Sequence, residues 1–250
     1  MQPGEITGQR PRYALLDAAR GVGMILMFVY HFSWDLSFFR MADFQIFSDP
    51  KWIWFAKFIA SIFLFVMGIA QVMARRRGLS RRAFLRRFTL IAAAAGAVSL
   101  ATFVIDPGSY IFFGILHHIA AASLILAVAI LLPSPALIGI ALVIAAAPWF
   151  LSGDLFNADL LHWLGLSTAA PISVDYVPIF PWLSVPLIGV VAGRIMFRGG
   201  RVPEFLLWVP ADPVSRLVHL IGRHSLLLYL VHQPILFGGV YLFVNFIAGE

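Results

Sequence analysis

Long apolar segments recur along this chain of 250 residues, and their length constrains the fold more than any other feature. Most of them reach the roughly 20 residues that a helix needs to cross the hydrocarbon of a bilayer. Hydrophobic residues make up 61% of the chain and charged residues 12%, about half the charged fraction of a water-soluble domain. This apolar excess does not fit inside one soluble core, so we predict an all-α, polytopic transmembrane bundle.

About seven spans are expected, and they form one domain over residues 1–250 because no internal repeat or linker interrupts them. The fifth is short, and two further apolar stretches, 155–166 and 205–209, are expected to lie at the membrane interface. The polar first dozen residues lead directly into an apolar helix, which we predict is a retained span and not a signal peptide. The spans are expected at 13–39, 52–74, 84–104, 111–132, 136–151, 177–197 and 216–248.

Arginines gather in three groups that alternating spans place on one side of the membrane. The loops on the other side carry six aspartates and few basic residues. Because basic loops stay in the cytoplasm, we predict a cytoplasmic N-terminus and an external C-terminus. These arginines could also have a second role, the attraction of an anionic cytosolic ligand. The net charge of +6 is explained by the basic loops, so no nucleic-acid partner is expected. The groups are Arg10 and Arg12; Arg75, Arg76, Arg77, Arg81, Arg82, Arg86 and Arg87; and Arg194, Arg198, Arg201 and Arg216.

The first span carries four ionisable residues along one face. Because successive helical residues turn by about 100°, Asp17, Arg20, His31 and Asp35 lie within an arc of roughly 60°. Charges inside a membrane usually face the bundle interior or a water-filled cavity. Asp35, one turn from His31, would orient the imidazole and raise its basicity, as a general base requires. Asp17 and Arg20 have the spacing of a structural ion pair, so that interpretation stays open beside a functional one.

The last span repeats this pattern in the segment GRHSLLLYLVHQP. Gly222, Ser225, Tyr229 and His232 lie within about 80° of one another on a helix. Pro234 follows and is expected to kink the helix and free a backbone carbonyl near the same level. The first and last spans therefore each present one polar face, and we expect these two faces to meet inside the bundle.

Histidines of three spans fall at a similar depth. Counting from the span boundaries places His31 and His232 in the outer third, with His117 about two turns below the outer boundary of the fourth span. We predict that the three line one cavity, with Ser225 and Tyr229 on its cytoplasmic side. Coordination of a metal by the three histidines is a weaker alternative because no local pair such as HExxH accompanies them, so no metal site is predicted. Packing roles are expected for His118 and His224.

Four stretches, in order, resemble the membrane acyltransferase superfamily. LDAARGVGMILMFVYHF carries Arg20, ten intervening residues and His31, as in the first helix of that superfamily. IFFGILHHIA, with His117, resembles its fourth helix. DYVPIFPWLSVPLIGVVAGR resembles its Asp-x-x-Pro-x-x-Pro-Trp segment, and GRHSLLLYLVHQP resembles its terminal element. These stretches cover most of the chain. The closer match is the heparan-alpha-glucosaminide N-acetyltransferase catalytic branch, here in a short bacterial-looking form, rather than the acyltransferase-three branch.

The resemblance implies transfer of an acyl group, expected to be acetyl, from cytosolic acyl-coenzyme A to a hydroxyl or amine acceptor outside, expected to be a saccharide. Acyl-CoA is a co-substrate, and no permanently bound cofactor is expected. The resemblance also implies a multi-pass protein in contact with the lipid bilayer of a cell membrane, expected to be a bacterial inner membrane. The expected catalytic residues are His31, Asp35, His117 and His232. The expected coenzyme A-binding residues are Arg20, Arg223, Ser225 and Tyr229.

Two functions of other classes compete with this one. A small-molecule or proton-coupled transporter would use the same His and Asp face as a proton relay, although the two halves show no repeat symmetry. A subunit of a membrane complex would use the polar face for structure alone. The chain has no cysteine, which excludes disulfides, thiolate nucleophiles and Cys-ligated metals.

Overall fold

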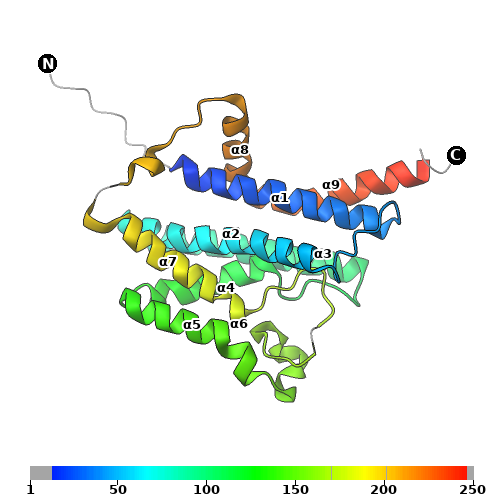
Figure 1. Cartoon of the computed structure of the whole chain (residues 1–250), viewed down its shortest axis with the longest axis horizontal. Helices are drawn as coiled ribbons and strands as arrows, with labels where there is room; N and C mark the ends of the chain where they lie inside the picture. Colours follow the sequence, from blue (N-terminus) through cyan, green and yellow to red (C-terminus); the bar gives the residue numbers. More distant parts are fainter. Residues whose placement is uncertain (1–12, 170, 201, 247–250) are drawn as a thin grey trace.

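The computed structural model describes residues 13–169, 171–200 and 202–246, and its regular elements there are all helical. The long helices run side by side and reverse direction from one to the next (Figure 1). Arg10, Arg12 and Arg201 of the predicted basic groups, and the predicted end of the last span at 247–248, lie outside the described residues. The helices are α1 Ala14–Phe38, α2 Pro50–Arg76, α3 Arg81–Ile105, α4 Ile115–Ala129, α5 Ser134–Leu151, α6 Ile179–Trp182, α7 Ser184–Met196, α8 Pro213–Arg223 and α9 Ser225–Phe246.

The described chain has six segments that are long and apolar enough to cross a membrane. They are α1, α2, α3, α5, the consecutive pair α6 and α7, and α9. The shorter apolar helix α4 lies between α3 and α5 in the chain. These elements confirm the predicted all-α polytopic bundle. The fifth span, expected to be short, is 18 residues long and has Pro135 in its first turn, where proline favours the start of a helix.

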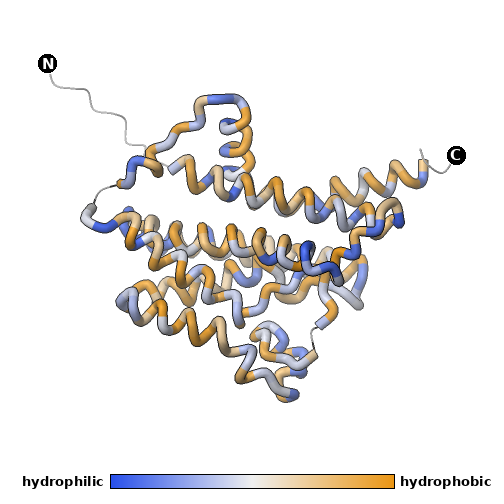
Figure 2. Tube along the Cα trace, viewed as in Figure 1, coloured by the Kyte–Doolittle hydropathy of each residue, from blue (hydrophilic) through white to orange (hydrophobic). Residues whose placement is uncertain are grey.

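Helices α2 and α7 make a close contact through glycine. A Cβ atom on Gly68 would overlap the carbonyl oxygen of Pro186, and one on Gly189 would overlap that of Phe65. Small residues allow this approach in a membrane, where packing rather than water expulsion holds helices together. The core around this contact includes Leu187 of α7, and it extends to α4 and α5 through Leu126 and Leu137. The helices remain rich in apolar residues over most of their length (Figure 2).

Helix α4 is shorter than the predicted span 111–132, and the reason lies at its two ends. Its first turn is fixed by Asp175, whose Oδ2 accepts a hydrogen bond of 2.9 Å from the backbone N–H of Ile115. At the other end, Arg194 donates to the carbonyl oxygens of Ile130 and Leu132. These side chains satisfy backbone groups that a longer helix would satisfy internally, as polar groups inside a membrane require.

The predicted seventh span, 216–248, is wrong at its start because the structure divides it into α8 and α9. Helix α8 crosses α1 steeply, and α9 begins where α8 ends (Figure 1). Helix α8 is amphipathic, with Leu217 and Leu220 exposed, which is typical of a helix lying along a membrane surface. Gly222 permits the crossing, because a Cβ atom there would overlap the carbonyl oxygen of Asp17.

The two stretches expected at the interface form short 3-10 turns. Leu155 and Leu160 belong to the turns Asp154–Asn157 and Asp159–Leu164 and are exposed. The stretch 205–209 overlaps the turn Glu204–Leu207, whose Leu206 is buried in the core. Neither stretch is long enough to cross the bilayer.

Candidate active site

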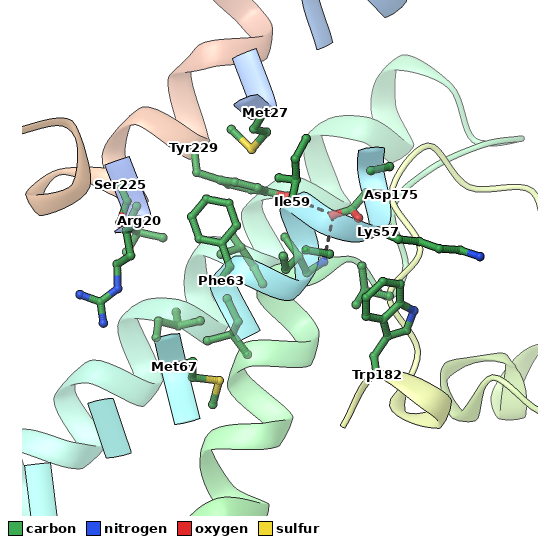
Figure 3. A pocket seen from close by; sticks show the side chains of 18 of the residues that line it. Arg20, Met27, Lys57, Ile59, Phe63, Met67, Asp175, Trp182, Ser225 and Tyr229 are labelled. Carbon is green, nitrogen blue, oxygen red and sulfur yellow. Dashed lines mark hydrogen bonds between the residues drawn. The ribbon is translucent and has the colours of Figure 1, made fainter. Parts of the chain in front are cut away.

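A cavity of about 1550 Å³ extends along the bundle between α1, α2, α3, α4 and α9 and reaches the loop before α6. We call the end lined by arginines of α1, α3 and α8 the basic end, and the end lined by that loop the opposite end. Figure 3 shows Arg20 and Ser225 toward one side, Lys57 and Trp182 toward the other, and Phe63 and Tyr229 between them. The lining thus changes from cationic through apolar to mixed aromatic and polar.

The basic end brings together arginines from separate parts of the chain: Arg20, Arg77, Arg86, Arg87 and Arg223. Arg20 donates a hydrogen bond of 2.9 Å to Asp17, so the ion pair left open by the sequence is present while Arg20 still lines the cavity. Three of these arginines, Arg77, Arg86 and Arg87, come from the group that the sequence assigned first to topology. Their convergence suits an anion with several phosphates, because guanidinium groups bind phosphate through paired N–H donors.

His31 lines the cavity between these ends. Its ring lies 4.8 Å from the ring of His232, measured between centroids. Within the described residues its nitrogens make no hydrogen bond, so they are available to a ligand. The Nδ1 of His232 lies 2.6 Å from the carbonyl oxygen of Tyr229. Since a carbonyl only accepts, Nδ1 carries the proton, and Nε2 of the neutral ring is an acceptor. The predicted meeting of α1 and the last span through His31 and His232 is therefore confirmed.

Asp35 is fully buried, but its described hydrogen bond goes to α9 and not to His31. Its Oδ1 accepts a bond of 2.7 Å from the amide of Gln233. The expected contact between Asp35 and the His31 imidazole is therefore wrong, because the described side-chain bond of Asp35 goes to Gln233 and its other oxygen makes no bond to His31. Within the described residues, Asp35 Oδ2, His232 Nε2 and Gln233 Oε1 are buried without a hydrogen-bond partner. Buried polar atoms are normally bonded, so these three atoms keep unused hydrogen-bonding capacity where α1 meets α9.

Asp175 is the main functional candidate that was absent from the predicted site. It lines the cavity and accepts from the Ile115 N–H and, at 3.1 Å, from the Tyr229 hydroxyl (Figure 3). Burial raises the pKa of this carboxyl, against the lowering effect of the two hydrogen bonds. The available signal was its place as the first residue of the segment DYVPIFPW. Asp175 thereby connects α4, α9 and the loop before α6.

His117 does not belong to the described lining of the cavity, and the prediction that three histidines line it is wrong for this residue. Its Nδ1 accepts from the Gly114 N–H, and its Nε2 lies 3.1 Å from Ser99 on α3. His117 thus caps the first turn of α4. The physical reason is the helix boundary: α4 begins at Ile115, so His117 is in the first turn and not two turns inside. His118 contacts the carbonyl oxygen of Val177, in agreement with its expected packing role.

His232 is likewise outside the described lining, although it touches His31. The four predicted coenzyme A-binding residues, in contrast, all line the cavity: Arg20, Arg223, Ser225 and Tyr229. Ser225 is the first residue of α9, directly after the α8 crossing, so the division of the last span places it and Arg223 at the basic end. Tyr229 follows one turn later, between this end and His232, as the sequence predicts.

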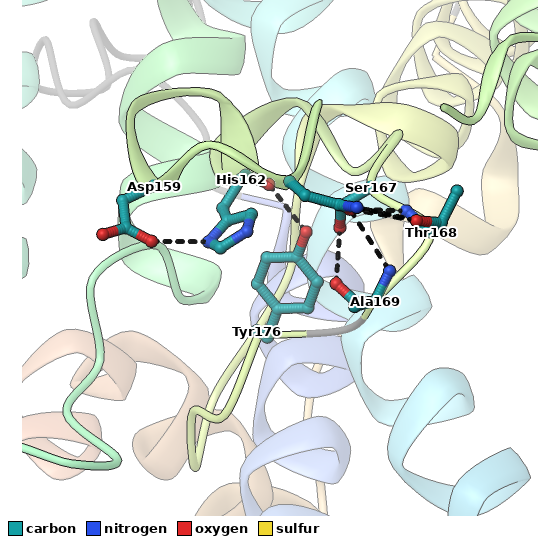
Figure 4. A network of polar contacts seen from close by, with 7 residues as sticks. Asp159, His162, Ser167, Thr168, Ala169 and Tyr176 are labelled. Atoms are coloured by element: carbon teal, nitrogen blue, oxygen red, sulfur yellow. Dashed lines mark hydrogen bonds and ion pairs between the residues drawn. The ribbon is translucent and has the colours of Figure 1, made fainter. Parts of the chain in front are cut away.

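The opposite end is bordered by polar residues of the connection between α5 and α6 (Figure 4). Asn157 holds Thr168 through its backbone N–H and hydroxyl, and the Tyr176 hydroxyl donates to the carbonyl oxygen of His162. Burial raises the pKa of Tyr176 to about 12, although a hydrogen bond with Ser167 opposes it. Ser167, Thr168 and Tyr176 line the cavity. This end can therefore meet a polar ligand with hydroxyl groups and aromatic faces.

Comparison with known proteins gives one match. A sequence model of the family described as heparan-alpha-glucosaminide N-acetyltransferase, catalytic, matches residues 12–234. The matched region contains α1 to α8, all the arginines at the basic end, His31, Asp175 and His232. No curated protein and no solved structure matches the chain.

Proposed function

Because the chain belongs to the heparan-alpha-glucosaminide N-acetyltransferase catalytic family, we propose that it transfers an acetyl group from cytosolic acetyl-CoA to a hydroxyl or amine acceptor outside. The observation that carries this proposal is the cavity, which connects an arginine-lined end to His31 and then to a loop with hydroxyl and aromatic side chains. A reaction that joins substrates from two sides of a membrane needs such a path.

The basic end would hold the phosphates of coenzyme A. Arg20, Arg86 and Arg87 approach from α1 and α3, and Arg223 from the end of α8. The positive-inside rule places this end in the cytoplasm, where acyl-CoA is made. The apolar lining beyond it, which includes Met27 and Phe63, suits the thin and weakly polar pantetheine arm. The thioester would then reach the level of His31, about 16 Å beyond Arg20 along α1.

His31 would act as the general base of the transfer. Its imidazole removes the proton from the acceptor O–H or N–H while that oxygen or nitrogen attacks the thioester carbonyl carbon. The new C–O or C–N bond forms, the C–S bond breaks, and the coenzyme A thiolate leaves and takes the proton back from the imidazolium. His232 lies against His31 and supports its ring position, and Asp35 lies one turn away and stabilises the transient positive charge.

The acceptor would enter from the opposite end. The hydroxyl groups of Ser167, Thr168 and Ser173 and the ring of Trp182 line this part of the cavity. A saccharide offers complementary hydroxyl groups and flat C–H faces, and it carries the hydroxyl or amine that the reaction consumes. We therefore propose a saccharide acceptor.

The test is a reconstitution with a defined orientation. Purified protein in liposomes would receive acetyl-labelled acetyl-CoA on one side and an amino sugar such as glucosamine on the other. We expect free coenzyme A thiol and labelled sugar to form in equal amounts, and only when acetyl-CoA is on the side of the basic end. Thioester cleavage without labelling of any hydroxyl or amine acceptor would refute the transferase. Movement of intact glucosamine across the membrane would instead support the transporter alternative.

A further inference from the structure

A second cavity, of about 410 Å³, lies beside the ends of α2, α4 and α7. It shares no lining residue with the candidate active site. Four arginines, Arg75, Arg76, Arg194 and Arg198, line it over a floor that includes Val72, Ile130 and Phe197. Its described lining contains no acidic side chain. We call it the arginine groove.

Two of these arginines are fixed in place by backbone groups. Arg76 donates a hydrogen bond of 2.7 Å to the carbonyl oxygen of Phe197. Arg194 donates bonds of 2.6 and 2.7 Å to the carbonyl oxygens of Ile130 and Leu132. These bonds cap the ends of α7 and α4 and neutralise no charge. A guanidinium has five N–H donors, so each of the two retains further donors for a ligand.

The other two arginines have no such anchor. Arg75 and Arg198 are exposed, and within the described residues their side chains make no hydrogen bond, ion pair or ring contact. Four like charges around one small groove repel one another unless an anion lies between them. Two fixed and two movable guanidinium groups can close around such an anion with paired N–H donors.

The surroundings of the groove indicate the chemistry of that anion. The groove lies at the ends of three apolar helices, which is the level of lipid headgroups in a membrane. Leu131 and Ile195, next in sequence to the lining residues Ile130 and Arg194, are 64% and 69% exposed. A ligand that combines a phosphate with alkyl chains fits both features. We propose that the arginine groove binds the phosphate of an anionic phospholipid whose acyl chains lie along Leu131 and Ile195.

The test compares two double variants that remove equal charge from the same end of the bundle. Arg75→Gln with Arg198→Gln removes the movable pair, while Arg76 and Arg194 keep their capping bonds. Arg81→Gln with Arg82→Gln is the matched control, since these residues are exposed on the first turn of α3 and line neither cavity. Phosphatidylglycerol and phosphatidylcholine binding to the purified full chain would be measured by native mass spectrometry and by the thermal unfolding midpoint.

We expect phosphatidylglycerol, but not phosphatidylcholine, to bind and to raise the unfolding midpoint of the wild-type chain. Loss of two surface cationic contacts should weaken this binding by roughly thirtyfold in the groove variant, and much less in the control. Equal losses of binding in both variants would overturn the site, because they would show that the lipid is attracted to the positive charge of this side of the bundle in general. If glycerol phosphate displaces the lipid at equal phosphate concentration, the groove binds a soluble phosphate and the proposed lipid ligand is wrong. Arg198→Gln alone, beyond the last turn of α7, decides the question if the double variant does not fold.

Discussion

Two carboxylates lie at or near the cavity, Asp175 in its lining and Asp35 buried in the bundle, and they are bonded differently. Asp175 accepts hydrogen bonds from the Ile115 N–H and the Tyr229 hydroxyl. Asp35 accepts one described bond, from Gln233, and its second oxygen has no partner within the described residues. Asp175 joins a loop and two helices, whereas Asp35 joins only α1 and α9.

This difference distinguishes a carboxylate that holds the structure together from one that can act on the reacting groups. The Oδ2 atom of Asp175 accepts bonds from two separate helices and so fixes the geometry between them, and removal of this side chain leaves both donors without an acceptor. Asp35 joins one partner and keeps a buried oxygen without a bond, and such a carboxylate near a reactive group can act through its charge. We infer that Asp175 builds the wall of the cavity and that Asp35 tunes the environment of His31. Variants of His31, Asp175 and Asp35 test this distinction.

His31→Ala provides the reference and should have the largest effect. Without the general base, we expect acetyl transfer to fall by about a thousandfold, within the range found for such groups. His224→Ala is the matched control, because His224 bonds locally to the Leu220 carbonyl and does not line the cavity. Transfer rates and unfolding midpoints would be measured for both. Near wild-type turnover by the His31 variant would contradict the catalytic role, and a low midpoint would make His31 structural.

Asp175→Ala should lower stability more than any change at Asp35. It leaves the Ile115 N–H and the Tyr229 hydroxyl without their acceptor, at a cost of roughly 2–5 kcal/mol in the free energy of unfolding. Asp175→Asn keeps an acceptor oxygen and should recover part of that loss. Chemical unfolding in detergent, with Asp35→Ala alongside, measures the difference. Equal losses in the free energy of unfolding at Asp35 and Asp175 would show that the two carboxylates do not differ in structural role.

Asp35→Asn should have a smaller effect than the changes at His31 and Asp175, and it should lower only the transfer rate. The amide keeps an oxygen for Gln233 but loses the negative charge one turn from His31. That charge stabilises the transient imidazolium, so its loss should raise the barrier by about 1.4 kcal/mol and lower the transfer rate roughly tenfold. The unfolding midpoint should stay the same. A lower midpoint with an unchanged rate would make Asp35 a structural group like Asp175.

The deciding measurement for Asp35→Asn is the transfer rate at one fixed pH with saturating acetyl-CoA. Gln233→Leu is its companion variant, because it removes the partner of Asp35 and leaves the charge in place. We expect the Gln233 variant to keep a higher rate than Asp35→Asn. The opposite order would show that the hydrogen bond, and not the charge, matters to His31.

The fold was largely predictable because span length and charge distribution are properties of the sequence alone. Apolar runs of about 20 residues located six crossings, since a bilayer imposes that length on any helix that crosses it. The predictions were wrong at the ends of α4 and at the α8–α9 junction, because contacts between residues distant in sequence determine where these helices begin and end. Asp175 fixes the start of α4 from 60 residues away, and Gly222 rests against the backbone of α1. Neither contact produces a periodic pattern in the sequence from which it could be predicted.

The candidate site was predictable only where helical periodicity governs it. The faces of α1 and α9 that carry His31 and His232 do meet. His117 was misplaced because its depth was counted from a helix start that lies four residues too early. Asp175 was outside the predicted site because loops have no period, so only its place in DYVPIFPW indicated a role.

The apolar middle of the cavity bears on the ion gradient across the membrane. A path from one side of a membrane to the other would discharge an ion gradient if hydrated ions could follow it. Met24, Met27, Phe63 and Met67 line the cavity between its two polar ends, and they offer no ligands to replace the water around an ion. An ion there would lose its hydration without compensation. Under the proposed function, the stretch that would accept the pantetheine arm would thus also keep ions from crossing the bilayer.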